Sequence, residues 1–144
     1  MIRHAGLIAR RERERWLGVL IEGPSGAGKS DLALRCLDHG FRLVGDDRVM
    51  LWVSAGRLFG RAPDALAGLI EARGLDVLQV EPLPFVEVAL VARCGEPERL
   101  PDPETARLLG VTLPLVTISA LEASAPAKLS RALARFDGGP KKRM

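Results

Sequence analysis

One stretch of sequence decides the fold of this chain: Gly23-Pro24-Ser25-Gly26-Ala27-Gly28-Lys29-Ser30. It fits the pattern G-x-x-x-x-G-K-[ST], in which glycines let the backbone turn tightly and aim successive N–H groups at phosphate oxygens. The apolar run 16–21 before it predicts a strand, and the apolar spacing over 31–38 after it predicts a helix. This context distinguishes a phosphate-binding loop from a glycine-rich turn that matches by chance.

The loop predicts a site for a nucleoside triphosphate with Mg²⁺. Lys29 is expected to reach the β- and γ-phosphates, and the Ser30 hydroxyl is expected to ligate Mg²⁺. The N-terminus of the following helix adds the positive end of its dipole. The use that the chain makes of the γ-phosphate must be decided by residues elsewhere.

Composition indicates one domain, because the chain has 144 residues of which 47% are apolar. Cys36 and Cys94 are expected to be reduced and buried, which favours a reducing compartment. No signal peptide and no apolar stretch of roughly 20 residues is visible, so we expect a cytoplasmic protein without a membrane partner. A phosphate pocket and a basic tail explain the net charge of +3, and the 4% of aromatic residues argues against nucleic acid as a partner.

The remaining chain alternates short strands with few helices. Strands are predicted over 2–9, 41–44, 48–53, 57–60, 77–80 and 85–92, an apolar segment over 110–118, and further helices over 65–72 and 126–136. Several connections are hairpin-length, including one capped by the charge cluster 10–15, which favours antiparallel pairing. We therefore predict an α/β fold: a single P-loop domain over 1–136 with a mixed, largely antiparallel sheet and few helices, followed by a flexible basic tail over 137–144.

Three groups of polar residues are candidates for chemistry. Asp46-Asp47 follow a strand expected beside the loop strand, so a carboxylate there can hold Mg²⁺ or accept a proton from an attacking hydroxyl. An Asp-Asp surface turn is the alternative. Glu71 and Arg73 could bind a metal and a phosphate together, and the alternative is that they form a surface salt bridge with each other. His4 alone is an ordinary surface histidine.

Four blocks of the chain together resemble the catalytic domain of HPr kinase/phosphorylase, in the short form that lacks the N-terminal domain. They are His4 in a strand ahead of the loop, residues 18–31 with the loop, residues 41–49 (Phe-Arg-Leu-Val-Gly-Asp-Asp-Arg-Val), and residues 68–78 (Gly-Leu-Ile-Glu-Ala-Arg-Gly-Leu-Asp-Val-Leu). The last of these blocks looks like the family signature. The resemblance covers roughly residues 2–136. It implies a kinase that uses ATP and Mg²⁺ to phosphorylate a serine of HPr, a small phosphocarrier protein, and it suggests a homo-oligomer, a hexamer in the family.

The resemblance also implies a role for each candidate residue. Lys29 binds the phosphates, Ser30 binds Mg²⁺, and Glu71 is the second metal-linked carboxylate. Asp47 accepts the serine proton, and in reverse it donates a proton as phosphate attacks phosphoserine and pyrophosphate leaves. Two further residues complete the catalytic set: His4, near the transferred phosphate, and Arg73, within the signature used in both directions.

The chain departs from the family pattern at three places. Residues 10–15 lengthen the hairpin after His4, and Asp76 stands where the family has glycine. Longer members carry an Arg-Pro-Gly-Arg-Asn loop near the C-terminus, whereas residues 120–128 here contain no arginine and offer Lys128 as the cation. Phosphorylation is therefore expected, and phosphorolysis stays open.

Two other functions remain as alternatives. A P-loop kinase of a small metabolite would need an arginine-bearing lid helix, and no segment here is long enough. A nucleotide-binding regulatory or RNA-binding module without catalysis would show a positive face outside the loop and would tolerate loss of Asp47.

Overall fold

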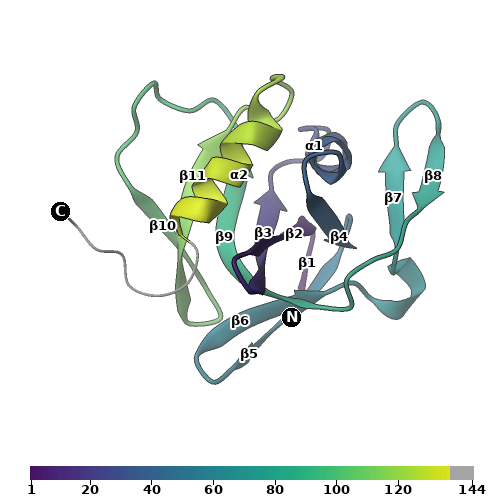
Figure 1. Cartoon of the computed structure of the whole chain (residues 1–144), viewed down its shortest axis with the longest axis horizontal. Coiled ribbons are helices and arrows are strands. Elements are labelled where there is room, and N and C mark those ends of the chain that lie inside the picture. The colour runs from purple at the N-terminus through teal and green to yellow at the C-terminus, as the bar shows by residue number, and fades with distance from the viewer. Residues whose placement is uncertain (137–144) are drawn as a thin grey trace.

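The computed structural model describes residues 1–136, so the tail predicted over 137–144 lies outside the described residues. Figure 1 shows a curved sheet with helices on one side and a small separate hairpin. The elements in chain order are β1 (Ile2–Arg3), β2 (Gly6–Glu12), β3 (Arg15–Glu22), α1 (Lys29–Leu37), β4 (Phe41–Gly45), β5 (Val49–Ser54), β6 (Arg57–Arg61), the 3-10 turn η1 (Asp64–Leu66), β7 (Leu69–Ala72), β8 (Asp76–Gln79), β9 (Val86–Cys94), β10 (Glu104–Leu108), β11 (Val111–Ile118) and α2 (Ala125–Arg135).

The main sheet has nine strands, and its order is β1-β5-β6-β9-β3-β2-β4, with β11 joined to β9 and β10 to β11. β3 runs parallel to β9, and β9 runs parallel to β11. The other strand pairs described are antiparallel, because short hairpins such as β2–β3 and β5–β6 return the chain directly. The predicted class, an α/β domain with a mixed, largely antiparallel sheet and few helices, is confirmed.

The sheet is buried on both faces, which explains the unbroken apolar run in β3. Val19 and Ile21 point into a core shared with α1 and α2, whereas Leu20 points into a second core enclosed by β5, β6 and the β10–β11 hairpin. Alternate residues of one strand therefore serve two cores. This packing fixes the end of β3, and with it the point where the glycine-rich loop begins.

The predicted helix over 65–72 is wrong. The chain forms η1 and then β7, which pairs with β8 in a two-stranded sheet. Gly68 separates the two elements with φ of 80°, and a Cβ there would lie 2.7 Å from the carbonyl oxygen of Val80. Burial of Ile70 and Ala72 alternates with exposure of Glu71, which is the period of a strand. The helices predicted over 31–38 and 126–136 are confirmed within two residues as α1 and α2.

Both thiols are free and buried, as expected: Cys36 lies on α1 and Cys94 at the end of β9. Burial raises the pKa of the Cys36 thiol to about 12, against a smaller lowering by Arg35, and burial also raises the pKa of Cys94. The reactive form of a cysteine is its thiolate, so neither thiol is activated in the folded chain.

We therefore expect iodoacetamide at about pH 8 to leave the native chain unlabelled and to label two thiols after unfolding in concentrated urea. Mass spectrometry of the two samples measures the labelling. Fast incorporation of one label into the native chain would contradict the buried, protonated state of these cysteines.

Candidate functional site

The glycine-rich loop leaves the end of β3 and enters α1, so it lies over the edge of the main sheet. Gly26 and Gly28 have φ of 81° and 96°, and a Cβ built on Gly26 would meet no atom within 4 Å. The Ala27 N–H donates to the Pro24 carbonyl oxygen at 3.1 Å, which curls the loop on itself. Positive φ at two glycines and an open face at Gly26 give the shape of an anion-binding loop.

A pocket of about 470 Å³ opens along this loop. We call it the loop pocket. It is lined by Ser25, Gly26, Gly28, Lys29, Ser30, Asp31, Asp46, Asp47, Glu71, Arg73 and Leu121. The fold thus gathers the loop, the end of β4, β7 and the β11–α2 connection around one space. Two predicted loop residues, Gly23 and Pro24, line a neighbouring pocket instead.

Asp46 links three elements of the loop pocket. The Ser30 hydroxyl donates to its carboxylate oxygens at 2.8 Å and 3.1 Å, and the Glu71 N–H donates to Oδ2 at 3.3 Å. The residue is 7% exposed. From the sequence, the acid pair is a single candidate, Asp47 has a role through the family resemblance, and Asp46 has no separate role. The signal that distinguishes the two acids, a hydrogen bond across sixteen residues, belongs to the tertiary fold.

Asp47 takes the opposite position, because its side chain is 72% exposed at the rim of the loop pocket. Its φ of 69° lies in the left-handed region, which Asp tolerates better than most residues. Its carbonyl oxygen accepts the Ala5 N–H at 3.2 Å, and its carboxylate lies 3.9 Å from Arg48. A solvent-facing carboxylate therefore stands beside the loop on an anchored backbone.

The Lys29 ammonium is folded back onto its own loop. Its Nζ donates to the carbonyl oxygens of Gly23 at 2.8 Å and Pro24 at 3.0 Å. Both partners are neutral, so an anionic ligand in the pocket offers this cation a stronger hydrogen bond than the carbonyls do.

Glu71 and Arg73 lie on β7 and at the tip of the β7–β8 hairpin, and both line the loop pocket. Within residues 1–136 the two side chains make no ion pair with each other, so the alternative of a surface salt bridge between them is wrong. A free carboxylate and a free guanidinium facing one pocket are available to a metal and a phosphate.

The donor set fits Mg²⁺ bound together with a triphosphate. Across the described part of the chain, no group of three His, Cys, Asp or Glu residues could hold a metal by itself. Mg²⁺ usually takes one or two protein carboxylates and completes its shell with phosphate oxygens and waters. Ser30, the Asp46 carboxylate bonded to it, and Glu71 are the groups that would hold it here, and the ion would offset charge on the phosphates.

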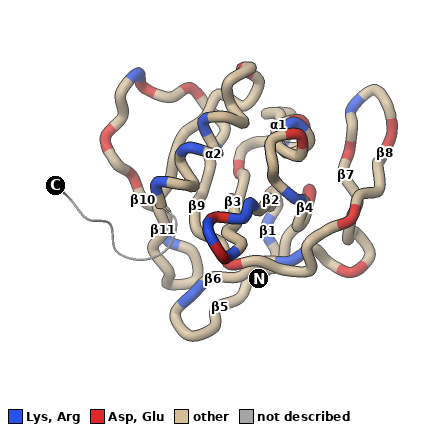
Figure 2. Tube along the Cα trace, in the orientation of Figure 1, with Lys and Arg blue, Asp and Glu red and all other residues tan. Residues whose placement is uncertain are grey.

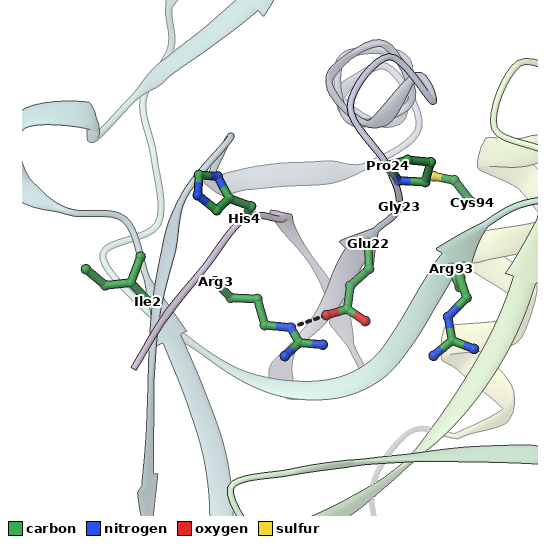
Figure 3. Close-up of a pocket in the computed structure, with 8 residues that line it drawn as sticks. All are labelled: Ile2, Arg3, His4, Glu22, Gly23, Pro24, Arg93 and Cys94. Atoms are coloured by element: carbon green, nitrogen blue, oxygen red, sulfur yellow. Dashed lines mark hydrogen bonds and ion pairs between the residues drawn. The ribbon is translucent and has the colours of Figure 1, made fainter.

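His4 lies outside the loop pocket. It lines the neighbouring pocket of about 560 Å³ with Gly23 and Pro24, near the ion pair of Arg3 with Glu22 (Figure 3). The hydrogen bond from Ala5 to Asp47 keeps its segment beside the rim acid. The structure thus brings His4 near the loop but not among the residues that surround Ser30.

Lys128, proposed as a replacement cation, lies apart from both pockets. Its ammonium pairs with Glu122, and it lines a separate hollow with Arg131 and Arg135 of α2. The residue that the 120–128 region contributes to the loop pocket is Leu121.

Burial of Asp46 has a consequence for stability that can be measured without ligand. Desolvation raises the pKa of this carboxyl above its usual value, and the hydrogen bonds from Ser30 and Glu71 lower it by less. A raised carboxyl pKa means that the native state binds the proton more tightly than the unfolded state does. The protonated Asp46 carboxyl therefore contributes to the free energy of unfolding at low pH, and this contribution is lost as pH rises through the folded pKa.

We therefore expect Asp46→Asn, which cannot ionise, to gain stability relative to the unmodified chain as pH rises from about 4 to about 7. Urea unfolding without Mg²⁺ or nucleotide measures this, with Asp102→Asn in the exposed β9–β10 loop as the matched control. Parallel pH profiles for Asp46→Asn and the unmodified chain would contradict the raised pKa.

Comparisons with known proteins agree with this geometry. The family described as HPr Serine kinase C-terminal domain matches residues 15–89. The HPr kinase/phosphorylase of Clostridium beijerinckii is 45% identical over 67 residues, 46% of this chain and 22% of that protein. The enzyme of the same name from Brevibacillus brevis is 34% identical over 117 residues, 71% of this chain and 38% of that protein. The chain therefore spans well under half the length of these relatives.

A solved structure matches nearly the whole chain. The Hpr(Ser) kinase/phosphatase from Coxiella burnetii superposes with a TM-score of 0.78 and 26% identity, covering 96% of this chain and 99% of that one. The family match includes the loop, the tandem acids and β7, and therefore every residue that lines the loop pocket except Leu121. The chain belongs to the family of the HPr serine kinase C-terminal domain.

Proposed function

We propose that this chain is an ATP-dependent serine kinase that phosphorylates an HPr-like phosphocarrier protein. One observation carries the proposal: the exposed Asp47 carboxylate lies on the rim of the same pocket as Lys29 and Ser30. A serine of another protein can reach this acid from solvent, whereas the buried Asp46 is available only from within the pocket.

Each side chain then has a defined task. Asp47 accepts the proton of the serine hydroxyl, which is a weak nucleophile at its own pKa. The serine oxygen forms a bond to the γ-phosphorus of ATP, and the bond from that phosphorus to the β-phosphate oxygen breaks, releasing ADP. Lys29 and the N–H groups of the loop stabilise the negative charge on the transferring group. Ser30, with Asp46 and Glu71, would hold Mg²⁺, which would offset charge on the phosphates.

His4 and Arg73 are proposed to assist at the edge of this reaction. Arg73 faces the loop pocket and can bind the phosphoryl group from the hairpin side. His4 stands beyond Gly23 and Pro24 in the neighbouring pocket, so its proposed place is the side on which the protein substrate approaches.

A protein substrate fits the surface better than the two alternatives do. The loop pocket opens to solvent without a lid helix among residues 1–136, and a kinase of a small metabolite would be expected to enclose its substrate. Outside α2, basic and acidic residues are interspersed along the trace rather than gathered on one face (Figure 2), which is unlike an RNA-binding surface. No helix in this part of the chain is long and apolar enough to cross a bilayer. The free thiols support a cytoplasmic location, and the hexamer of the family is the proposed assembly.

Incubation of the chain with ATP, Mg²⁺ and purified HPr tests the proposal, with phosphoserine detected by mass spectrometry. Phosphoserine on HPr is the expected product. ATP binding without phosphoserine would instead favour a regulatory module. Addition of inorganic phosphate to phosphorylated HPr tests the reverse reaction, which would release pyrophosphate if phosphorolysis is retained.

A further inference from the structure

Leu121 differs from every other residue around the loop pocket. Of the described residues that line this pocket, it alone carries an apolar side chain, and it is 70% exposed. An isolated exposed leucine on a protein surface is common. This leucine lies at a pocket whose other lining residues are glycines, serines and charged residues, so it offers the one apolar side chain to a ligand there.

The backbone on both sides of Leu121 is held firmly by one arginine. Arg35 of α1 donates to the Glu122 carbonyl oxygen at 3.1 Å and also to the carbonyl oxygen of Ala120. Its third contact is with Asp31, at 2.9 Å, which holds the guanidinium in place. The two carbonyl groups flank Leu121 in the chain, so the fork of Arg35 fixes where that side chain stands.

A tight turn adds to this restraint. The Glu122 N–H donates to the Ser119 carbonyl oxygen at 3.2 Å, which places Leu121 at the third position of a four-residue turn. Ala120, one residue before, is buried. Leu121 is therefore an apolar group presented on a rigid backbone, and not the end of a free loop.

The position of Leu121 relative to the acids points to what it contacts. A Cβ built on Gly28 would lie 2.9 Å from Leu121 Cδ2, so the leucine covers the start of α1. Figure 1 shows α2 on one side of α1 and the β7–β8 hairpin, which carries Glu71, on the other. Leu121 and Glu71 therefore reach the loop pocket from different sides, so a nucleotide whose terminal phosphate faced the acids would direct its nucleoside toward Leu121.

We propose that Leu121 is the nucleobase-contacting residue of this site and that Arg35 is its positioning residue. The inference rests on the proposed use of ATP. The flat face of a purine buries apolar surface against the leucine side chain, as any planar ring does. Because this contact is with the ring face and not with its polar edge, and a purine presents a larger face than a pyrimidine, it favours purine nucleoside triphosphates as a class.

Calorimetric binding of ATP and of inorganic tripolyphosphate, each with Mg²⁺, tests the contact directly. Leu121→Ala is expected to raise the Kd for ATP about fivefold, from the apolar area removed, and to leave the Kd for tripolyphosphate unchanged. Leu100→Ala removes another exposed leucine, 86% accessible, from the β9–β10 loop and is expected to change neither Kd.

The positioning role of Arg35 has its own signature. Arg35→Ala is expected to weaken the binding of ATP more than that of tripolyphosphate, because it frees the turn that carries Leu121. Any loss common to both ligands reports the Asp31 carboxylate, which loses its partner and lines the same pocket. Arg35→Lys keeps a cation that can bind one carbonyl group, so it should restore part of the ATP affinity. Equal loss of both ligands in Arg35→Ala would indicate damage to α1 and would contradict a role through Leu121.

The remaining outcomes are also decisive. The base contact would be overturned if Leu121→Ala raised the Kd for ATP and for tripolyphosphate equally, or changed neither Kd. An effect of this variant confined to the KM for HPr would overturn it as well. Wild-type chain that binds neither ATP nor tripolyphosphate would overturn the proposed function and the base contact together. Wild-type chain that binds ATP with the expected loss in Leu121→Ala, but forms no phosphoserine, would contradict the kinase and support the base contact.

Discussion

Asp47→Asn is expected to lower kcat for phosphorylation of HPr by about 10²–10⁴-fold while ATP binding is unchanged. The variant keeps the shape of the side chain and removes its ability to accept a proton. Asn also tolerates the left-handed φ of 69° at this position, so the backbone has no reason to move. The side chain is exposed and its ion pair with Arg48 is long, at 3.9 Å, so we expect the stability to change by no more than about 0.5 kcal/mol.

Initial rates with radiolabelled ATP and saturating HPr measure this effect, and calorimetry checks nucleotide affinity. Asp102→Asn is the matched control, because it makes the same change at an exposed acid in the β9–β10 loop. Equal rates for Asp47→Asn and the unmodified chain would remove Asp47 from proton transfer. A normal kcat with a higher KM for HPr would instead assign Asp47 to substrate docking.

The part of the site that is local in sequence could be predicted from the sequence. The loop from Gly23 to Ser30, the strand before it and the helix after it depend on neighbouring residues, and all three lie where the pattern placed them. The glycines made this prediction possible, because Gly26 and Gly28 adopt a positive φ, a conformation that favours glycine.

The part of the fold and site that depends on contacts between distant segments could not be predicted from the sequence. β7 was mistaken for a helix because a short apolar run such as Leu69–Ile70 suits both periods, and its partner strand β8 decides between them. Leu121 is held beside the loop by hydrogen bonds from Arg35, which lies more than eighty residues earlier in the chain. No local sequence pattern predicts this contact.

The tandem acids show the same limit within two residues. Asp46 points inward to Ser30, whereas the positive φ at Asp47 turns the chain and sends the next carboxylate to solvent. The residues by themselves identified only the pair, and the choice of Asp47 came from the family resemblance, because the turn that separates the two acids is not specified by the local sequence. Under the proposed function, Asp46 would orient the Ser30 hydroxyl while Asp47 would meet the incoming serine, two tasks that a single carboxylate could not perform.

Lys29→Met is expected to reduce kcat/KM for ATP by about 10²–10³-fold, the usual effect of removing one donor that stabilises charge in the transition state. Methionine keeps most of the length and apolar volume of the lysine stem and removes only the cation. The Lys29 ammonium donates hydrogen bonds to the carbonyl oxygens of Gly23 at 2.8 Å and Pro24 at 3.0 Å. Those two bonds are neutral at one end and partly exposed, so their loss is expected to cost no more than about 1–2 kcal/mol of stability.

The comparison that isolates the role of Lys29 is with Lys128→Met, because Lys128 is the other lysine within residues 1–136 and its ammonium pairs with Glu122, away from both pockets. We expect Lys128→Met to retain normal kinase rates, with thermal unfolding confirming that both variants fold. Normal turnover by Lys29→Met would show that the glycine-rich loop does not use its lysine on ATP. Loss of phosphorolysis alone in Lys128→Met would show that this lysine replaces the arginine of the longer family members, although it lies outside the loop pocket in the nucleotide-free chain.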